Sequence, residues 1–281
     1  MALVCIILAL LIERSVSFLD RLRNYRWFDA YSKIMMRNLP GVDQQGAASI
    51  IILLLPVLIP IGLLQYFLAG HCYELFSFSF ALMVLIYSLG SNLNRDIKHY
   101  LQACESGATE LAQQRASAIL GKPAAANTQQ QTIDVMHGLL QQSNMRVFAV
   151  LFWFVLLGPG GALLYRLTCH TLHHSPSQTL SRAAYRLEAV LSWLPVNLLA
   201  LSFALAGDYG NVSEGWRNKP KQNDLATCNY HTLVKAGIGA IGNCKPGDEI
   251  ACIQALRNLL KRSLIIWLAV IALLTLIGWM A

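Results

Sequence analysis

The sequence predicts an all-α, polytopic integral membrane protein with four to six membrane-embedded helical segments and further amphipathic helices in the cytoplasm. First, 55% of the 281 residues are hydrophobic and only 13% are charged, whereas an average soluble domain carries about 25% charged residues. Second, several apolar runs approach the roughly 20 residues that a helix needs to cross the hydrocarbon core. Third, proline and glycine interrupt these runs, which membrane helices tolerate when neighbours satisfy the exposed backbone groups.

The first membrane segment is expected over residues 1–22. Its apolar run MALVCIILALLI covers about 18 Å as a helix, less than the roughly 30 Å hydrocarbon core, so the helix has to continue beyond the run. Glu13 and Arg14 follow the run and are expected at the interface or paired inside the protein. Residues 23–45 combine basic and aromatic side chains at helical spacing, which predicts an amphipathic helical segment on the cytoplasmic side.

Two further segments, residues 47–69 and 76–92, are expected to cross the membrane. The first contains two prolines, which kink a membrane helix without excluding it. Residues 93–146 are more polar and predict a cytoplasmic helical hairpin whose second helix begins near Thr132 as its N-cap.

The second half of the chain predicts three more membrane segments and one polar region. Residues 147–165 and 188–206 are apolar enough to insert, but Gly-Pro-Gly-Gly interrupts the first and a proline interrupts the second. Residues 207–262 are polar and are expected to be cytoplasmic and helical, whereas residues 263–281 form an uninterrupted span. The protein has six crossings if both interrupted segments cross the membrane and four if both are re-entrant or interfacial.

The distribution of positive charge predicts the orientation. The 22 Lys and Arg residues divide into six in 14–45, five in 93–146, three in 166–186 and eight in 207–262, and the loop 70–75 contains none. Because basic residues gather on the cytoplasmic side, the three most basic regions are expected in the cytoplasm and the loop outside.

Several classes of protein are disfavoured. The net charge of +7 is assigned to membrane-flanking residues, because no basic run interleaved with aromatic residues indicates a nucleic-acid surface. The chain lacks the G-x-x-x-x-G-K-[ST] nucleotide motif, and no Ser/His/Asp, Cys/His or paired-carboxylate arrangement indicates catalysis. The seven cysteines form no C-x-x-C pair and are predicted to be free thiols. The identity of any cofactor stays unknown.

The glycine break and the arginine that follows it form the main candidate ligand site. Gly160 and Gly161 are expected to adopt positive φ and to let backbone N–H groups approach an anion closely. Tyr165 and Arg166 follow the break, and Arg166 would be the main charged contact of a shallow, inward-facing pocket whose floor is the break. The expected ligand is an anionic or phosphate-bearing small molecule, such as a nucleotide or a lipid headgroup. In the alternative interpretation, Arg166 extends to the membrane surface and contacts lipid.

Further polar side chains extend this candidate site, because polar groups in membrane segments usually face a partner or a cavity. Glu188 and Asn197 lie in the second interrupted segment, and Glu188 either pairs with Arg182 or Arg186 at the interface or belongs to the ligand site. The candidate ligand-binding residues are Glu13, Arg14, Gly160, Gly161, Tyr165, Arg166, Arg182, Arg186, Glu188 and Asn197.

Three histidines form a separate candidate metal site. His170, His173 and His174 are spaced so that a helix would present them on one face. They could hold a divalent metal ion, with Cys169 or another helix completing the ligand set. In the alternative interpretation they form an interfacial basic patch without a ligand, because no carboxylate accompanies them locally.

Four stretches of the sequence resemble the AmpE family of inner-membrane proteins. They are Ile12-Glu13-Arg14, Tyr100-Leu101, residues 144–148 leading into 152–154, and, most strongly, LEAVLSWLPVNLLALSFALAG at residues 187–207. The resemblance covers residues 1–281 as a single domain. It implies a multi-pass protein of the bacterial inner membrane with a non-enzymatic regulatory or signalling function in β-lactamase induction and cell-wall stress. It also adds a muropeptide to the candidate anions and implies a membrane or cytoplasmic signalling partner besides the lipid bilayer.

This family is similar in turn to the cobalamin-biosynthesis membrane proteins of the CobD/CbiB group. The glycine break and Tyr165-Arg166 fit a motif of that group, but His170 and His173 stand where the group has Asn and Asp. The N-terminal Asp-Pro-x-x-x-Pro-His-Pro motif of the group is absent. The similarity implies an alternative function, a membrane enzyme acting on a phosphate-bearing or amphiphilic substrate. A transporter is disfavoured because the sequence shows no internal repeat.

Overall fold

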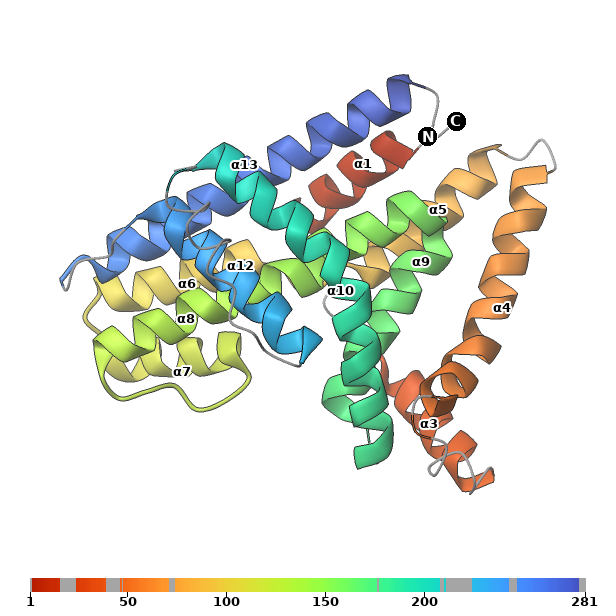
Figure 1. Cartoon of the computed structure of the whole chain (residues 1–281), viewed down its shortest axis with the longest axis horizontal. Coiled ribbons are helices and arrows are strands. Elements are labelled where there is room, and N and C mark those ends of the chain that lie inside the picture. Colours follow the sequence, from red (N-terminus) through yellow and green to blue (C-terminus); the bar gives the residue numbers. More distant parts are fainter. Residues whose placement is uncertain are drawn as a thin grey trace. The chain divides into compact units, whose positions relative to one another are not determined.

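Helix is the only regular secondary structure in the described part of the chain, which confirms the predicted fold class (Figure 1). The computed structural model describes residues 2–15, 24–38, 46, 48–70, 74–175, 177–207, 210, 224–242 and 247–277. The helices are α1 (Ala2–Ser15), α3 (Arg26–Asn38), α4 (Ala48–Gly70), α5 (Glu74–Ser88), α6 (Leu93–Glu105), α7 (Thr109–Leu120), α8 (Thr128–Ser143), the π-helical turn η2 (Asn144–Phe148), α9 (Ala149–His174), α10 (Gln178–Ala206), α12 (Leu225–Ile241) and α13 (Glu249–Leu276).

Among the residues described, 5 helical stretches are long and apolar enough to cross a membrane. They are Ala48–Leu68 in α4, Leu75–Glu105 through α5 and α6, Thr128–His174 through α8 and α9, Gln178–Ala206 in α10, and Glu249–Leu276 in α13. The chain is therefore a multi-pass membrane protein in contact with the lipid bilayer. The expected segment 1–22 is helical as far as Ser15, and its remainder lies outside the described residues.

Helix α8 begins one turn earlier than the sequence predicted. The side chain of Asn127 caps the helix by accepting hydrogen bonds from the N–H groups of Gln129 at 2.9 Å and Gln130 at 3.3 Å. The expected start near Thr132 is wrong, because asparagine caps helices more effectively than threonine. Thr132 is instead buried inside the helix, where its hydroxyl donates to the Thr128 carbonyl at 3.0 Å.

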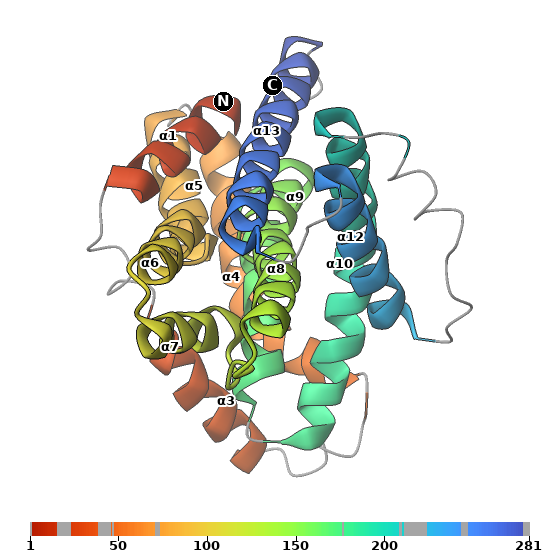
Figure 2. The same ribbon diagram turned by 90° about the vertical axis from the view of Figure 1, so that its left-hand side faces the viewer.

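The described helices form two compact units, and each is described by itself. The first unit comprises Met1–Ser91, Met145–Trp193 and Ile271–Ala281, and the second comprises Asn92–Asn144 and Leu194–Val270. In the first unit, α9 packs against α4 and α5, and α1 packs against α5. In the second unit, α7 packs against α6 and α8, and α8 also contacts α12 (Figure 2).

The interior of the first unit joins α3, α4, α9 and the beginning of α10. Apolar side chains from these four helices form one buried cluster, which brings the amphipathic α3 against the membrane-spanning helices. The cluster consists of Tyr25, Phe28, Ile50, Leu53, Leu54, Leu163, Leu167, Leu180, Ala183 and Ala184.

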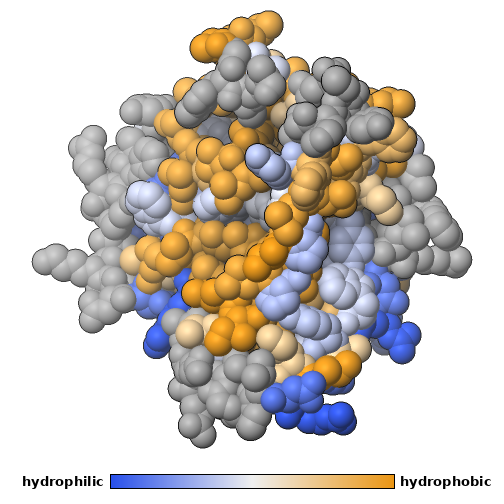
Figure 3. Space-filling model, turned by 90° about the vertical axis from the view of Figure 1, so that its right-hand side faces the viewer, coloured by the Kyte–Doolittle hydropathy of each residue, from blue (hydrophilic) through white to orange (hydrophobic). Residues whose placement is uncertain are grey.

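The outer face of α4 is apolar and exposed, as expected for a surface that contacts lipid. Figure 3 shows hydrophobic residues over much of the face that carries α4, with strongly hydrophilic residues near its lower end. A helix that is hydrophobic on all sides suits a membrane span better than an aqueous surface. The exposed side chains of α4 include Ile51, Leu55, Ile59, Leu63, Leu64 and Phe67.

The described cysteines include an exception to the predicted free thiols. Cys252 is disulfide-bonded. Among the described cysteines, Cys5, Cys104, Cys169 and Cys228 carry thiols, as the sequence predicted. Spacing alone could not identify this bond, because a disulfide depends on the distance between the two Cα atoms in the folded chain.

The sidedness of the membrane segments stays a prediction, and reporter fusions test it. Because residues 93–146 and 207–262 carry most of the basic side chains, we expect fusions at residues 120 and 230 to be inactive with alkaline phosphatase and active with a cytoplasmic reporter. A fusion at residue 72 should give the opposite result. Phosphatase activity at residue 120 or 230 would contradict this orientation.

Candidate functional site

Helix α9 is broken at Gly158. The φ of 68° and ψ of −155° at Gly158 lie far from helical values, and Pro159 follows with no N–H to donate. Residues with a Cβ rarely adopt this backbone conformation, so glycine is required there. The break divides α9 into a first half, residues 149–157, and a second half, residues 159–174.

Gln65 of α4 reaches the break and bonds to both sides of it. Its Oε1 accepts a hydrogen bond from the Gly160 N–H at 3.4 Å, and its Nε2 donates to the Leu157 carbonyl at 3.5 Å. These bonds satisfy backbone groups at the end of one half-helix and the start of the other. Sequence reasoning missed Gln65, although an amide side chain within an apolar run was a usable signal.

The two glycines after the break have different roles from those predicted. The expectation that Gly160 and Gly161 adopt positive φ is wrong, because Gly158 alone does so within this break. Gly161 instead allows the two halves of α9 to approach, since a Cβ there would overlap the backbone carbonyl of Trp153. A Cβ at Gly160 would lie 3.7 Å from the side-chain oxygen of Gln65, which is an ordinary contact.

The structure separates the glycine break from Arg166. A groove of about 500 Å³ lies at the break, and none of its described lining residues is basic. Arg166 follows Gly161 by five positions, which corresponds to about 140° around a helix, so the two residues face different neighbours. The groove is lined by Leu58, Gly62, Gln65, Tyr66, Leu157, Gly160, Gly161 and Leu164.

Arg166 faces the beginning of α3. Its Nε donates a hydrogen bond to the hydroxyl oxygen of Tyr25 at 3.3 Å, and its guanidinium carbon lies 5.5 Å from the centre of the Tyr25 ring. This geometry permits a cation–π interaction in addition to the hydrogen bond. The Tyr25 hydroxyl donates in turn to the carbonyl of Tyr87, near the end of α5, at 2.8 Å. Tyr25 therefore links α9 to α5.

His170 lies one turn beyond Arg166 and contacts an acidic residue of α3. His170 Nε2 lies 2.7 Å from Asp29 Oδ1, and 11% of the His170 side chain and 34% of the Asp29 side chain are exposed. The His170 ring stacks on His174 with the ring centres 4.4 Å apart, and its centre is 4.9 Å from that of Tyr25. We call Tyr25, Asp29, Arg166 and His170 the Arg166 cluster.

The histidines do not converge on a common point. One ring nitrogen of His170, Nε2, is in contact with the Asp29 carboxylate, whereas the side chains of His173 and His174 are exposed. Across the described residues, no group of three or more His, Cys, Asp and Glu side chains is arranged to hold a metal ion. The geometry therefore gives the metal hypothesis no support.

Two further bonds hold α3 in place beside the cluster. Trp27 Nε1 donates to the Tyr87 hydroxyl at 2.7 Å, and the Tyr31 hydroxyl donates to the Leu53 carbonyl at 3.1 Å. Burial raises the pKa of the Tyr31 phenol above its ordinary value, so this group stays protonated and able to donate. Sequence reasoning missed these tyrosines and Asp29, because their roles depend on contacts between segments far apart in the chain.

Tyr165 and Glu188 meet in a second buried polar group. The Tyr165 hydroxyl donates to Glu188 Oε1 at 3.3 Å and lies 2.9 Å from Ser192 Oγ. The Ser192 hydroxyl also donates to Glu188 Oε1, at 2.5 Å. Tyr165 is fully buried. The partners of Glu188 are thus hydroxyl groups one turn along α10 and across on α9, and no bond to the arginines of α10 is present in the described structure.

The remaining candidate residues differ in burial and in the unit to which they belong. Arg182 and Arg186 are exposed on α10. Glu13 is buried in α1, and Arg14 beside it is exposed. Asn197 belongs to the second unit. Of the predicted residues, the structure therefore brings Tyr165 together with Glu188, stacks His170 on His174, and places Arg166 and His170 against the same tyrosine, Tyr25.

The fold and these two polar groups define a multi-pass helical membrane protein with charged side chains buried between its helices. The profile of one family, described as "Regulatory signalling modulator protein AmpE", matches residues 1–281. The chain belongs to the AmpE family.

Two curated proteins, both described as "Cobalamin biosynthesis protein CobD", are similar to part of the chain. The protein from Stutzerimonas stutzeri (strain A1501) is 32% identical over 118 residues, which are 40% of this chain and 38% of that protein. The protein from Chromobacterium violaceum is 32% identical over 152 residues, which are 50% of this chain and 46% of that protein. The chain thus spans less than half the length of the curated relatives that it matches. No solved structure matches the chain.

Proposed function

We propose that this chain is a non-enzymatic regulator of the bacterial inner membrane, associated with β-lactamase induction and cell-wall stress, and that it responds to an anionic ligand bound by Arg166. The match to a family of regulatory signalling modulators over residues 1–281 supports the regulatory role. The proposal of an anionic ligand rests on the surroundings of Arg166. Within the described structure Arg166 donates one hydrogen bond, to Tyr25, and forms no ion pair with a carboxylate.

A positive charge within a membrane-spanning helix is costly unless a partner compensates it. The carboxylates of Asp29 and Glu188 already have other partners. Asp29 contacts His170, and Glu188 accepts hydrogen bonds from Tyr165 and Ser192. The planar guanidinium of Arg166 can donate two parallel hydrogen bonds to a phosphate or carboxylate. An anion would therefore supply the missing negative charge. A lipid headgroup, a nucleotide and a muropeptide all present that chemistry.

The contacts of Arg166 suggest how binding could reach a signalling partner. An anion bound to the guanidinium competes with the Tyr25 hydroxyl for the same donor, and Tyr25 is one of the residues that hold the start of α3. Helix α3 also exposes Trp27 and Ile34, which are available to a cytoplasmic or membrane partner. The ligand would thus shift the balance between a docked and a released α3.

A deletion strain tests the regulatory role. We expect that removing the gene lowers the β-lactamase activity induced by a β-lactam severalfold, and that a plasmid copy of the wild-type gene restores it. The uninduced activity and growth without the drug serve as controls, because a regulator of induction leaves both unchanged. Equal induced activity with and without the gene would refute this role.

The partial similarity to the cobalamin biosynthesis proteins favours a second candidate, a membrane enzyme acting on a phosphate-bearing or amphiphilic substrate. In that case Arg166 would bind the substrate of the enzyme rather than a regulatory ligand. The two functions are separated by expressing the chain in a strain that lacks its cobalamin biosynthesis protein. Restored cobalamin-dependent growth would support the enzyme. Absence of growth in this strain, together with restored β-lactamase induction in the deletion strain described above, would support the regulator.

A further inference from the structure

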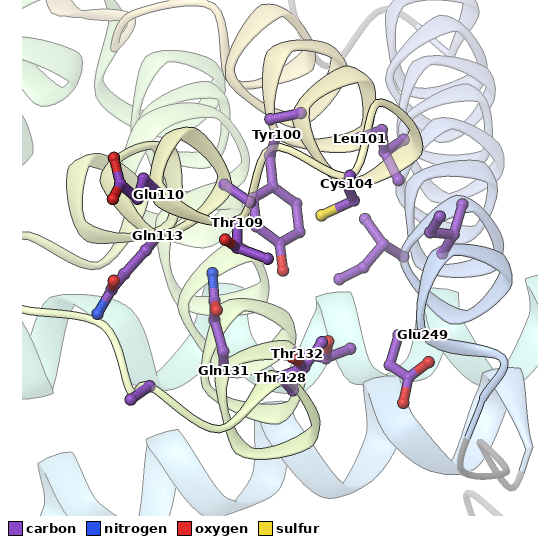
Figure 4. Close-up of a pocket in the computed structure, with 16 residues that line it drawn as sticks. Tyr100, Leu101, Cys104, Thr109, Glu110, Gln113, Thr128, Gln131, Thr132 and Glu249 are labelled. Carbon is purple, nitrogen blue, oxygen red and sulfur yellow. The ribbon is translucent and has the colours of Figure 1, made fainter.

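The second unit contains a cavity of about 340 Å³ between α6, α7, α8 and the first turns of α13 (Figure 4). This volume lies in the range of small-molecule sites. All described residues that line the cavity belong to the second unit, and none of them is part of the Arg166 cluster. The lining residues that the argument uses are Tyr100, Cys104, Glu110, Gln113, Gln131 and Glu249.

Gln131 of α8 carries a buried donor that has no partner. Its side chain is 7% exposed, and its Nε2 makes no hydrogen bond. Figure 4 shows the amide end of Gln131 directed into the cavity, toward Thr109 and the ring of Tyr100. Buried donors in folded proteins almost always find an acceptor, so an unpaired one at a cavity wall marks a position where a bound molecule can supply that acceptor.

The rest of the lining restricts the charge of that molecule. The amide nitrogen of Gln113 is already used, since it donates to the Ala124 carbonyl at 3.3 Å. Among the described residues that line the cavity, the ionisable carboxylates are Glu110 and Glu249, and none is Lys, Arg or His. An anion would thus meet negative charge without compensation. Apolar side chains such as Leu101, Ile250 and Ile253 complete the wall and favour an uncharged body.

We propose that this cavity binds a small uncharged molecule whose carbonyl oxygen accepts a hydrogen bond from Gln131 Nε2. The candidate span Leu75–Glu105 ends at the cavity, and the spans Thr128–His174 and Glu249–Leu276 both begin there. This ligand differs in charge from the anion proposed for Arg166, so the two sites are tested independently.

Cys104 lies in the cavity wall and reports its occupancy, because it carries a thiol. Iodoacetamide is a small uncharged amide, and iodoacetate is its anionic counterpart of similar size. In both reactions the thiolate sulfur attacks the CH₂ carbon, the C–S bond forms, the C–I bond breaks and iodide leaves. Cys228 of α12 is the internal reference, because it also carries a thiol but does not line the cavity.

The experiment measures alkylation at both cysteines by mass spectrometry on the detergent-purified full chain. We expect the rate at Cys104 to saturate with iodoacetamide and to rise linearly with iodoacetate, because only the amide binds before it reacts. Gln131→Met should lower the rate of iodoacetamide alkylation at Cys104 about twofold to tenfold, because one neutral hydrogen bond to the amide is lost. The rate at Cys228 should not change. Gln129→Met is the matched control, since Gln129 is exposed on the same helix.

Gln131→Glu provides a second variant in case the methionine variant does not fold. It retains the shape of the side chain but presents oxygen atoms to the carbonyl, so it should abolish saturation. The proposal is overturned if both Gln131 variants react like the wild type, if iodoacetate saturates as iodoacetamide does, or if Cys104 does not react with the amide at all.

Discussion

Replacing Gly158 with alanine is expected to remove most of the folded protein from the membrane fraction. The φ of 68° and ψ of −155° at this position belong to a region that is nearly closed to residues with a Cβ, at a cost of about 1–3 kcal/mol. The added Cβ would also lie 2.5 Å from Gln65 Nε2 and displace the side chain that bonds across the break. Both effects lower the free energy of unfolding, which is only about 5–15 kcal/mol for a typical protein.

Size-exclusion chromatography of detergent-solubilised fluorescent fusions measures this effect. Gly158→Ala and Gly161→Ala should reduce the monodisperse peak severalfold, the second because its Cβ would overlap the Trp153 carbonyl. Gly160→Ala adds the same methyl group between these two positions and should elute like the wild type, because its Cβ finds an ordinary contact. A normal peak for Gly158→Ala would show that the break tolerates a Cβ.

The helix break illustrates which features of the fold were visible in the sequence. Gly-Pro-Gly-Gly within an apolar run located the interruption, because each residue acts through its own backbone preference. The sequence could not tell which glycine adopts positive φ, since that depends on Gln65 of α4, 95 positions from Gly160. That the chain is all-helical and multi-pass was predictable from its hydropathy, whereas the start of α8 depended on a competition between two candidate caps, Asn127 and Thr132.

Replacing Arg166 with alanine is expected to weaken anion binding about tenfold to a hundredfold. A hydrogen bond to a charged group contributes about 1.5–3 kcal/mol, and removing the guanidinium removes the charge as well. Arg166→Lys should recover only part of the affinity, because an ammonium group cannot form the bidentate pair of hydrogen bonds that a guanidinium forms with an anion. If Arg166 merely contacts lipid at the membrane surface, lysine should substitute fully.

The Arg166 cluster shows why the site was only partly predictable. Their polar character inside or beside apolar segments drew attention to Arg166, Tyr165 and Glu188 in the sequence. Their grouping was not visible, because adjacent residues on a helix point about 100° apart and so face different neighbours. Asp29 lies 141 positions from His170 and meets it only because α3 packs against α9.

The most direct test of an anion-responsive regulator is the thermal unfolding of the purified full chain, followed through its 6 tryptophans, with sodium phosphate, nucleotides, anionic phospholipids and muropeptides. Arg182→Ala is the matched control, because it removes an exposed arginine from a neighbouring helix. We expect at least one anion to raise the unfolding midpoint of the wild type and of Arg182→Ala, to raise that of Arg166→Lys less, and to leave Arg166→Ala unchanged. Stabilisation of Arg166→Ala equal to that of the wild type, or no stabilisation by any anion, would contradict the account.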